Sequence, residues 1–423
     1  MKKYFLICAC TACLSPGLFS QQSDTTLQRY IATALRVSPR LMALHSRQNA
    51  YGSRIAQASN LPDPRVAFTL NNLPVNSFSF TQEPMTGKMI SLSQEFPFPG
   101  KLSARESIAA GDEKIAEQET GDARLELTRD VKQTYNELAY LAQAIRIQEQ
   151  ARQIYREFAR VVRTKYEVGK GSQQDILKSD LEVSRTTEKI ISLQERRNAL
   201  TATLNSLLLN DPATPLSIDS LQVPETFTQL TEASLIEKAK ANRPLLMGLQ
   251  AAQQKAEAQR NLATLAWYPD FTVGAAYTQR DYMKTTNTNF VDFASVSVTM
   301  NIPLNYGGKR TAAEDEAQST EQMYEYQYNS AIQSLQKLFG KSIAAINSIT
   351  DRLDLLETGL LPQASQTLTA SLAGYQVSEV DYLTVLDNQA KLFQMETDVY
   401  RLRADYWKEI AEIEFLSGTE KLQ

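Results

Sequence analysis

The chain has 423 residues, of which 43% are hydrophobic and 22% charged, and its formal net charge at pH 7 is −4. This length and composition are those of a folded protein and exclude a disordered chain. The weak acidic balance gives no electrostatic reason to expect nucleic acid as a partner.

The N-terminus has the pattern of a secretory signal. Lys2 and Lys3 precede an apolar run that ends at Leu14, and a short stretch ending at Ser20 supplies a small residue for cleavage. A basic, an apolar and a small-residue region in this order predict that residues 1–20 are a signal peptide. Its removal would leave 42 of the 44 basic residues against 48 acidic ones.

All three cysteines, Cys8, Cys10 and Cys13, lie within this predicted signal peptide. The mature chain would therefore have neither a disulfide nor a thiolate metal site, and packing alone would stabilise it. The alternative is lipidation of Cys13, although Cys10 stands where a lipidation signal normally has Leu.

After residue 20, no stretch approaches the roughly 20 apolar residues that a membrane-spanning helix requires. If the exported chain enters a membrane, it must do so through β-strands. Two classes remain at this point, a soluble periplasmic protein and an outer-membrane barrel.

The sequence is a tandem repeat with a period of just over 200 residues. Pro39 and Pro244 lie in matching segments, as do Pro62 and Pro269 further along. The match continues from the segment around Gly100 to that around 308, and from 166–169 to 375–378. The turn-rich segment 210–224 is predicted to be a linker between a first repeat at 21–209 and a second at 225–423.

Between the matching segments at Pro62 and Gly100, and at their counterparts in the second repeat, residues alternate in polarity and therefore predict β-strands. Val66, Phe68 and Leu70 alternate with small or polar residues, and the pattern recurs over 294–302. Partner strands are expected at 90–96 and 271–278, which gives β-hairpins at about 65–97 and 270–303. Their connections, 71–88 and 279–292, are long and polar, as in the outer loops of membrane barrels.

After each hairpin the apolar period becomes seven, the pattern of a coiled coil. The clearest row of such residues is Ile332, Phe339, Ile346, Leu353 and Leu360. Antiparallel α-hairpins are predicted at about 102–208 and 309–417. The outgoing helix of the first, 105–165, would be roughly 90 Å long at 1.5 Å per residue, so it would span a gap.

Four strands per chain are too few to close a barrel, whose smallest single-chain form has about eight. Closure therefore requires several copies, and a trimer would supply twelve strands and twelve long helices.

Two motifs resemble those of TolC-like outer-membrane efflux proteins. They are Gln-Glu-Phe-Pro-Phe-Pro-Gly-Lys-Leu at 94–102 and Tyr-Glu-Val-Gly-Lys-Gly-Ser at 166–172. The first motif is most similar to the heavy-metal branch, which is CzcC/CusC-like. The resemblance covers the whole mature chain.

The resemblance implies a mixed α and β membrane protein. Its trimeric 12-strand outer-membrane β-barrel, with four strands per chain, continues as a long α-helical coiled-coil barrel in the periplasm. The implied partners are two further copies, outer-membrane lipid, a periplasmic adaptor and an inner-membrane RND pump. The implied function is a passive exit conduit for the pump's substrates, with heavy-metal cations favoured by the first motif. A type I secretion exit channel of the same fold and a periplasmic coiled-coil scaffold are the alternatives.

By the same resemblance, the turns between the paired helices are the tips that dock to the adaptor. Val168 and Gly169 match the family's Val-Gly turn in the first repeat. Val377 and Ser378 match it in the second. Ser378 stands where the family has glycine, so the match to the family is weaker at the second tip.

The family also has carboxylates that ring the closed entrance near the second tip. Asp387 matches one of them, and Thr384 stands where another would be. A threefold ring of Asp387 would attract cations in a narrow pore. The alternative is an ordinary solvated charge on a long helix.

Catalytic and cofactor chemistry is not predicted. His45 is the only histidine, and no cysteine remains after residue 20, so zinc or copper sites of the usual ligand spacing cannot be built. The Gly-Gly-Lys-Arg run at 307–310 lacks the spacing of a nucleotide-binding loop and is interpreted as a strand-to-helix turn. An enzyme is therefore a remote alternative.

Overall fold

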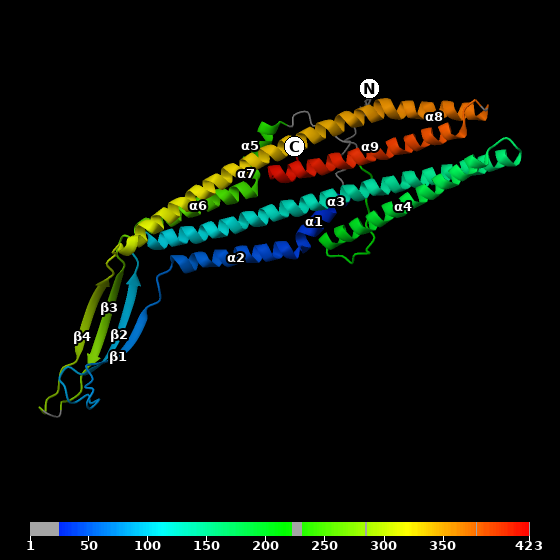
Figure 1. Ribbon diagram of the computed structural model, residues 1–423. Helices are drawn as coiled ribbons and strands as arrows, with labels where there is room; N and C mark the ends of the chain where they lie inside the picture. The colour runs from blue at the N-terminus through cyan, green and yellow to red at the C-terminus, as the bar shows by residue number, and fades with distance from the viewer. Residues whose placement is uncertain (1–24, 222–230, 284–285, 378, 423) are drawn as a thin grey trace, which may run out of the picture.

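The computed structural model describes residues 25–221, 231–283, 286–377 and 379–422. The predicted signal peptide, part of the predicted linker and Ser378 lie outside the described residues. The described chain is a long rod of helices with a small β-sheet at one end (Figure 1). At the other end the chain turns back twice, each time between two paired helices. Within it, no helix is both long and apolar enough to cross a membrane.

The first repeat contains two short helices, a β-hairpin and a long helical hairpin. In chain order these are α1 (Thr25–Val37), α2 (Pro39–Ser59), β1 (Arg65–Asn71), β2 (Gly87–Phe96), α3 (Lys101–Glu167) and α4 (Gln173–Leu207). The 67 residues of α3 correspond to about 100 Å at 1.5 Å per residue. Figure 1 shows that α3 runs from the sheet to the far tip of the rod.

The second repeat follows the same order. Its elements are α5 (Glu232–Asn242), α6 (Pro244–Leu265), β3 (Phe271–Gln279), β4 (Phe293–Met300), η1 (Tyr306–Gly308), α7 (Lys309–Asp354), the π-helical turn η2 (Leu355–Leu360), α8 (Leu361–Gln376) and α9 (Tyr382–Ser417). The mixed α and β fold with an internal tandem repeat is thus present.

The repeat marks stand where helices begin. Pro39 and Pro244 occupy the first turns of α2 and α6, where the fixed φ of proline favours a helix and its missing N–H is not needed. Gly100, with φ of 95°, precedes α3. A left-handed residue at that point favours glycine and turns the chain from strand to helix.

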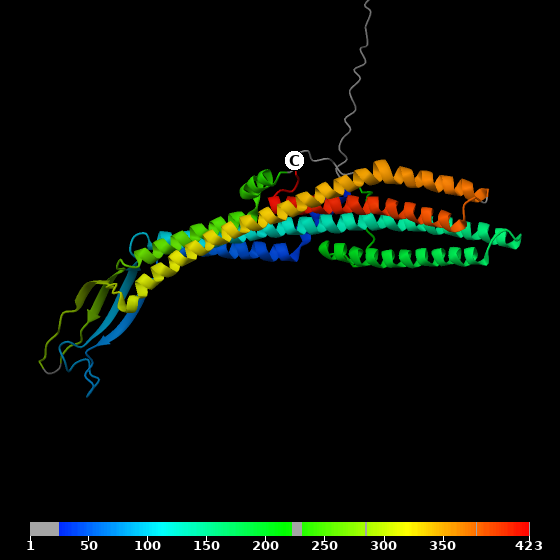
Figure 2. The same ribbon diagram turned by 45° about the horizontal axis from the view of Figure 1, so that its top comes forward.

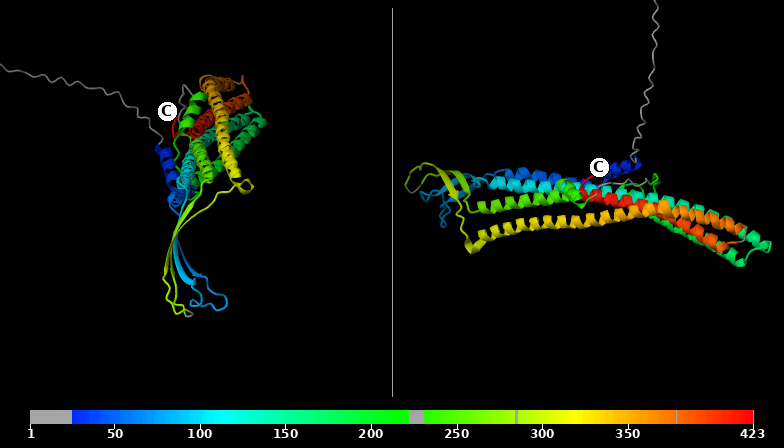
Figure 3. Two further views of the ribbon diagram at one scale, coloured as in Figure 1. Left: turned by 90° about the vertical axis from the view of Figure 1, so that its left-hand side faces the viewer. Right: turned by 90° about the horizontal axis from the view of Figure 1, so that it is seen from above.

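Each long helix packs along its length against two shorter ones that follow one another. α2 and α4 contact α3 near the sheet and near the tip respectively, and α6 and α9 each contact both α3 and α7 (Figure 2). The C-terminus of α9 lies at mid-length of the rod, as the right-hand view of Figure 3 shows. Buried apolar residues therefore form a chain of clusters along the rod.

The seven-residue row of α7 shifts by one residue at η2. Phe339, Ile346 and Leu353 are buried, as the period predicts. Beyond the π-helical turn the row continues with Leu361 and Leu368, one position later than the row expected through Leu360. A π-helical turn accommodates one extra residue within a helix, so it brings the apolar row back to the side of the helix that faces the core.

Candidate functional site

The four strands form one antiparallel sheet in the order β1-β2-β3-β4. Because directly paired residues share a face, the register places Val66, Leu92, Ala275 and Val296 in one row on the same side. The other side carries mostly small or hydroxyl residues. One of its rows consists of Ala67, Ser91, Ala276 and Ser295, and the next consists of Ser93, Gly274 and Ser297 with Arg65 at the β1 edge.

The apolar face of this sheet is exposed. Val66 and Phe68 on β1 are each 69% exposed, and Val296 on β4 is 81% exposed. No helix of the described chain contacts the sheet face closely enough to cover it. In addition, β1 and β4 are each paired on one side only within the described sheet, which leaves two open edges for further strands.

The sheet is held to the rod by an ion pair between a buried lysine and a partly buried aspartate. The Nζ atom of Lys101, at the start of α3, lies 2.8 Å from Oδ1 of Asp270, which directly precedes β3. The same oxygen accepts a hydrogen bond from the N–H of Phe98 at 2.7 Å. Lys101 also donates to the carbonyl of Tyr268, so this contact joins the strand-to-helix turn of the first repeat to the helix-to-strand turn of the second.

Midway along the rod, Glu137 on α3 is a buried carboxylate that three basic side chains surround. Its oxygens lie 2.7 Å from Arg196 on α4, and 2.8 Å from Arg401 and 2.9 Å from Lys408 on α9. Burial alone would raise the pKa of Glu137, but the hydrogen bond and charge of Lys408, with the charges of the two arginines, lower it. The carboxylate therefore links the two helical hairpins.

Replacing Glu137 with Gln is expected to destabilise the protein by about 1.5–3 kcal/mol at neutral pH, because charged hydrogen bonds are lost. The lowered pKa means that the contribution is present above the ordinary value of 4.5 and is lost as the pH falls through the folded-state pKa. When the unmodified protein and Glu137→Gln are unfolded by heat in detergent, the difference between their midpoint temperatures should therefore disappear below pH 4.5. The exposed Glu195 on α4 offers a control, since Glu195→Gln should have little effect. A difference in midpoint temperature between Glu137→Gln and the unmodified protein that stays the same in acid would contradict this role.

The first predicted docking tip lies at the far end of the rod, in the turn between α3 and α4. Val168 is 64% exposed. Gly169 has φ of 73°, and a Cβ atom added to it would meet no other atom within 4 Å. The N–H of Gly169 donates to the carbonyl of Tyr166 at 2.9 Å. The turn is therefore free to contact another molecule, and its backbone favours glycine.

The second tip, between α8 and α9, lies beside the first (Figure 1). Val377 is 65% exposed, while Ser378 lies outside the described residues. Lys165 on α3 stands 3.7 Å from the ring centroid of Tyr375 on α8, a cation–π contact. Ser179 Oγ and Tyr382 Oη form a buried 2.6 Å hydrogen bond between α4 and α9, so the two hairpins pack together near the tips.

Asp387 lies on the exposed side of α9, close to the start of the helix. Its carboxylate forms an ion pair of 2.6 Å with Lys391, one turn further along the same helix, and both side chains are more than half exposed. Neighbouring Val385 and Leu386 are buried. The backbone N–H of Thr384 donates a hydrogen bond to the carboxylate of Asp381, which caps the start of the helix. Within one chain, Asp387 is therefore a solvated charge with a local partner.

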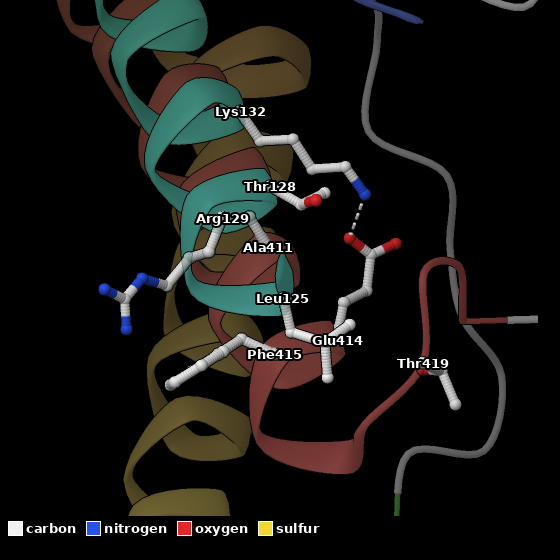
Figure 4. Close-up of a pocket in the computed structure, with 8 residues that line it drawn as sticks. All are labelled: Leu125, Thr128, Arg129, Lys132, Ala411, Glu414, Phe415 and Thr419. Atoms are coloured by element: carbon white, nitrogen blue, oxygen red, sulfur yellow. Dashed lines mark hydrogen bonds and ion pairs between the residues drawn. The ribbon is translucent and has the colours of Figure 1, made fainter. Parts of the chain in front are cut away.

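The small cavity in Figure 4 is enclosed by α3 and the end of α9. Its volume of about 10 Å³ is about that needed for one water molecule. Lys132 and Glu414 meet beside it at 2.6 Å. Burial raises the pKa of Glu414, and Lys132 opposes this effect. The pair is therefore a structural contact between α3 and the C-terminal end of α9.

A sheet with one apolar exposed face, two open edges and a long helical rod defines the subunit of an outer-membrane channel. The family model for outer membrane efflux proteins matches residues 30–208 and 235–419, and the chain belongs to this family.

Individual relatives support the assignment over nearly the whole chain. The cobalt-zinc-cadmium resistance protein CzcC of Cupriavidus metallidurans is 22% identical over 420 residues, covering 93% of this chain and 94% of that protein. The crystal structure of the outer membrane protein VceC of Vibrio cholerae superposes with a TM-score of 0.79 at 18% identity, covering 93% of this chain and 96% of that one. A CusC crystal structure gives a TM-score of 0.76 at 18% identity, with coverage of 94% and 93%.

Proposed function

We propose that this chain is one subunit of a trimeric outer-membrane channel, the passive exit conduit of a tripartite efflux system. The observation that carries the proposal is the position of the exposed apolar sheet at one end of a rod of about 100 Å. The sheet would lie in the outer membrane and the rod would cross the periplasm. The alternative of a periplasmic scaffold gives the apolar face no role.

The trimer follows from the sheet. Four strands with two open edges cannot close on themselves, whereas three copies joined β4 to β1 would give a barrel of twelve strands, above the minimum of about eight. The purified protein in mild detergent is therefore expected to have the protein mass of three chains. A monomer that stays in the aqueous phase without detergent would overturn the proposal.

We propose that the two tips dock to a periplasmic adaptor, which connects the channel to an inner-membrane RND pump. The exposure of Val168 and Val377 and the open turn at Gly169 support this role. Ser378 would give the second tip a different contact from the first.

A ring of three Asp387 side chains is proposed as the constriction near the tips. Lys391 neutralises part of this charge within each chain, so the ring would favour cations only modestly. Heavy-metal cations are the proposed cargo, because CzcC is named for cobalt, zinc and cadmium resistance. We propose no catalytic activity and no resident cofactor.

A further inference from the structure

Exposed apolar residues follow one another along the chain beyond the end of β4. On the apolar face of this strand, Val296, Val298 and Met300 are exposed. After Met300 the alternation persists to the start of α7, and its three further apolar members are 72%, 54% and 80% exposed: Ile302, Leu304 and Tyr306. The exposed apolar run thus ends in a tyrosine, and the exposed basic residue Lys309 follows within three residues.

The first repeat has the same residue types at the matching place, but there they are covered. When Gly100 is aligned with Gly308, Phe98 corresponds to Tyr306 and Lys101 corresponds to Lys309. Phe98 stacks on Tyr268 with ring centroids 4.5 Å apart, and Lys101 is buried against Asp270. The second repeat therefore exposes an aromatic and a basic side chain that the first repeat uses inside the fold.

We propose that Tyr306 and Lys309 form an anchor for phospholipid headgroups, in the membrane leaflet on the side of the helical rod. A tyrosine with an apolar ring and a polar hydroxyl is suited to the membrane–water interface, and a lysine ammonium pairs with lipid phosphate. The order along the chain is apolar, aromatic and basic, which matches hydrocarbon, interface and headgroup. The inference rests on the proposed function, in which the sheet spans the membrane.

The test uses single cysteines, because the sequence has no cysteine after residue 20. Nitroxide labels are attached to Tyr306→Cys, Val298→Cys and Ser334→Cys, and each protein is reconstituted into vesicles of phosphatidylethanolamine and phosphatidylglycerol. Collisions with oxygen report the hydrocarbon, and collisions with a water-soluble nickel chelate report water. Ser334 is an exposed α7 residue about 38 Å along the helix from Lys309.

We expect the Val298 label to favour oxygen strongly and the Ser334 label to favour nickel. The Tyr306 label is expected between them, at the depth of the phosphates. Nickel accessibility at 306 equal to that at 334 would overturn the anchor, and so would a label shielded from both reagents, since it would indicate contact with a second copy. If the Val298 label also favours nickel, the error lies in the proposed function itself.

A second measurement keeps an aromatic residue at the site. Tyr306→Trp in a background of Trp267→Phe and Trp407→Phe makes residue 306 the one tryptophan of the sequence, and lipids brominated at different depths quench it according to distance. The strongest quenching is expected from bromines nearest the headgroup. Adding Lys309→Glu should weaken that quenching in phosphatidylglycerol vesicles, because the phosphate would then face a like charge. Quenching that is absent at every depth would contradict the proposal.

Discussion

Replacing Val296 with Arg is expected to prevent stable insertion of the protein into the outer membrane. Val296 lies in the middle of β4 on the apolar face and is 81% exposed. An arginine facing lipid near the bilayer midplane costs about 2–4 kcal/mol per chain, and a trimer carries the substitution three times. Membrane fractionation of cells that produce the variant should show loss of the trimer from the outer membrane.

Ser295→Arg is the matched control. Ser295 is the neighbouring residue of β4, also exposed, and its side chain lies on the opposite, polar face of the sheet. In the proposed barrel this face lines the water-filled interior, so trimer yield should stay close to that of the unmodified protein. Equal loss with both variants would show that the two faces do not differ in environment.

Phe339→Ala is expected to destabilise the helical rod by about 3–5 kcal/mol, because it removes a large buried ring and leaves a cavity. Phe339 on α7 is fully buried in a cluster that includes Leu335, Leu402 and Tyr406. The measurement is the free energy of unfolding in detergent at a fixed protein concentration, since stability of an oligomer depends on concentration.

Lys337→Ala, on the same helix but exposed, should change that free energy by no more than about 0.5 kcal/mol. A small effect of Phe339→Ala in the same assay would mean that this cluster is not a core of the rod.

Much of the fold could be predicted from local patterns. Period-two alternation around Val66 and Val296 indicated strands, and the seven-residue row through Phe339 indicated a long coiled-coil helix. Both patterns are local consequences of burial on one side, which is why a single sequence shows them. The internal repeat then indicated that a β-hairpin and a helical hairpin in one half should also be present in the other.

Other features depend on information that local patterns do not carry. The buried residues of α6 are mostly alanines, namely Ala251, Ala252 and Ala256, and small residues allow close helix packing without a conspicuous apolar stripe. The one-residue shift at η2 was also missed, because Leu360 and Leu361 are both apolar and only the helix geometry decides between them.

The candidate site divides in the same way. The residues of the tips and Asp387 were found through motifs, and their roles remain proposals. Glu137 was missed because its partners Arg196, Arg401 and Lys408 lie 59, 264 and 271 residues away. In the sequence it is one acidic residue among many on a polar helix, and no local signal marks it as buried.

The most direct test of the proposed conduit is the single-channel conductance of the purified protein in a planar lipid bilayer. Discrete openings from a trimeric preparation, with a preference for cations that Asp387→Asn reduces, are the predicted result. A preparation that inserts no conducting pores, at protein concentrations where a known outer-membrane channel does so, would contradict the claim that this chain forms a conduit.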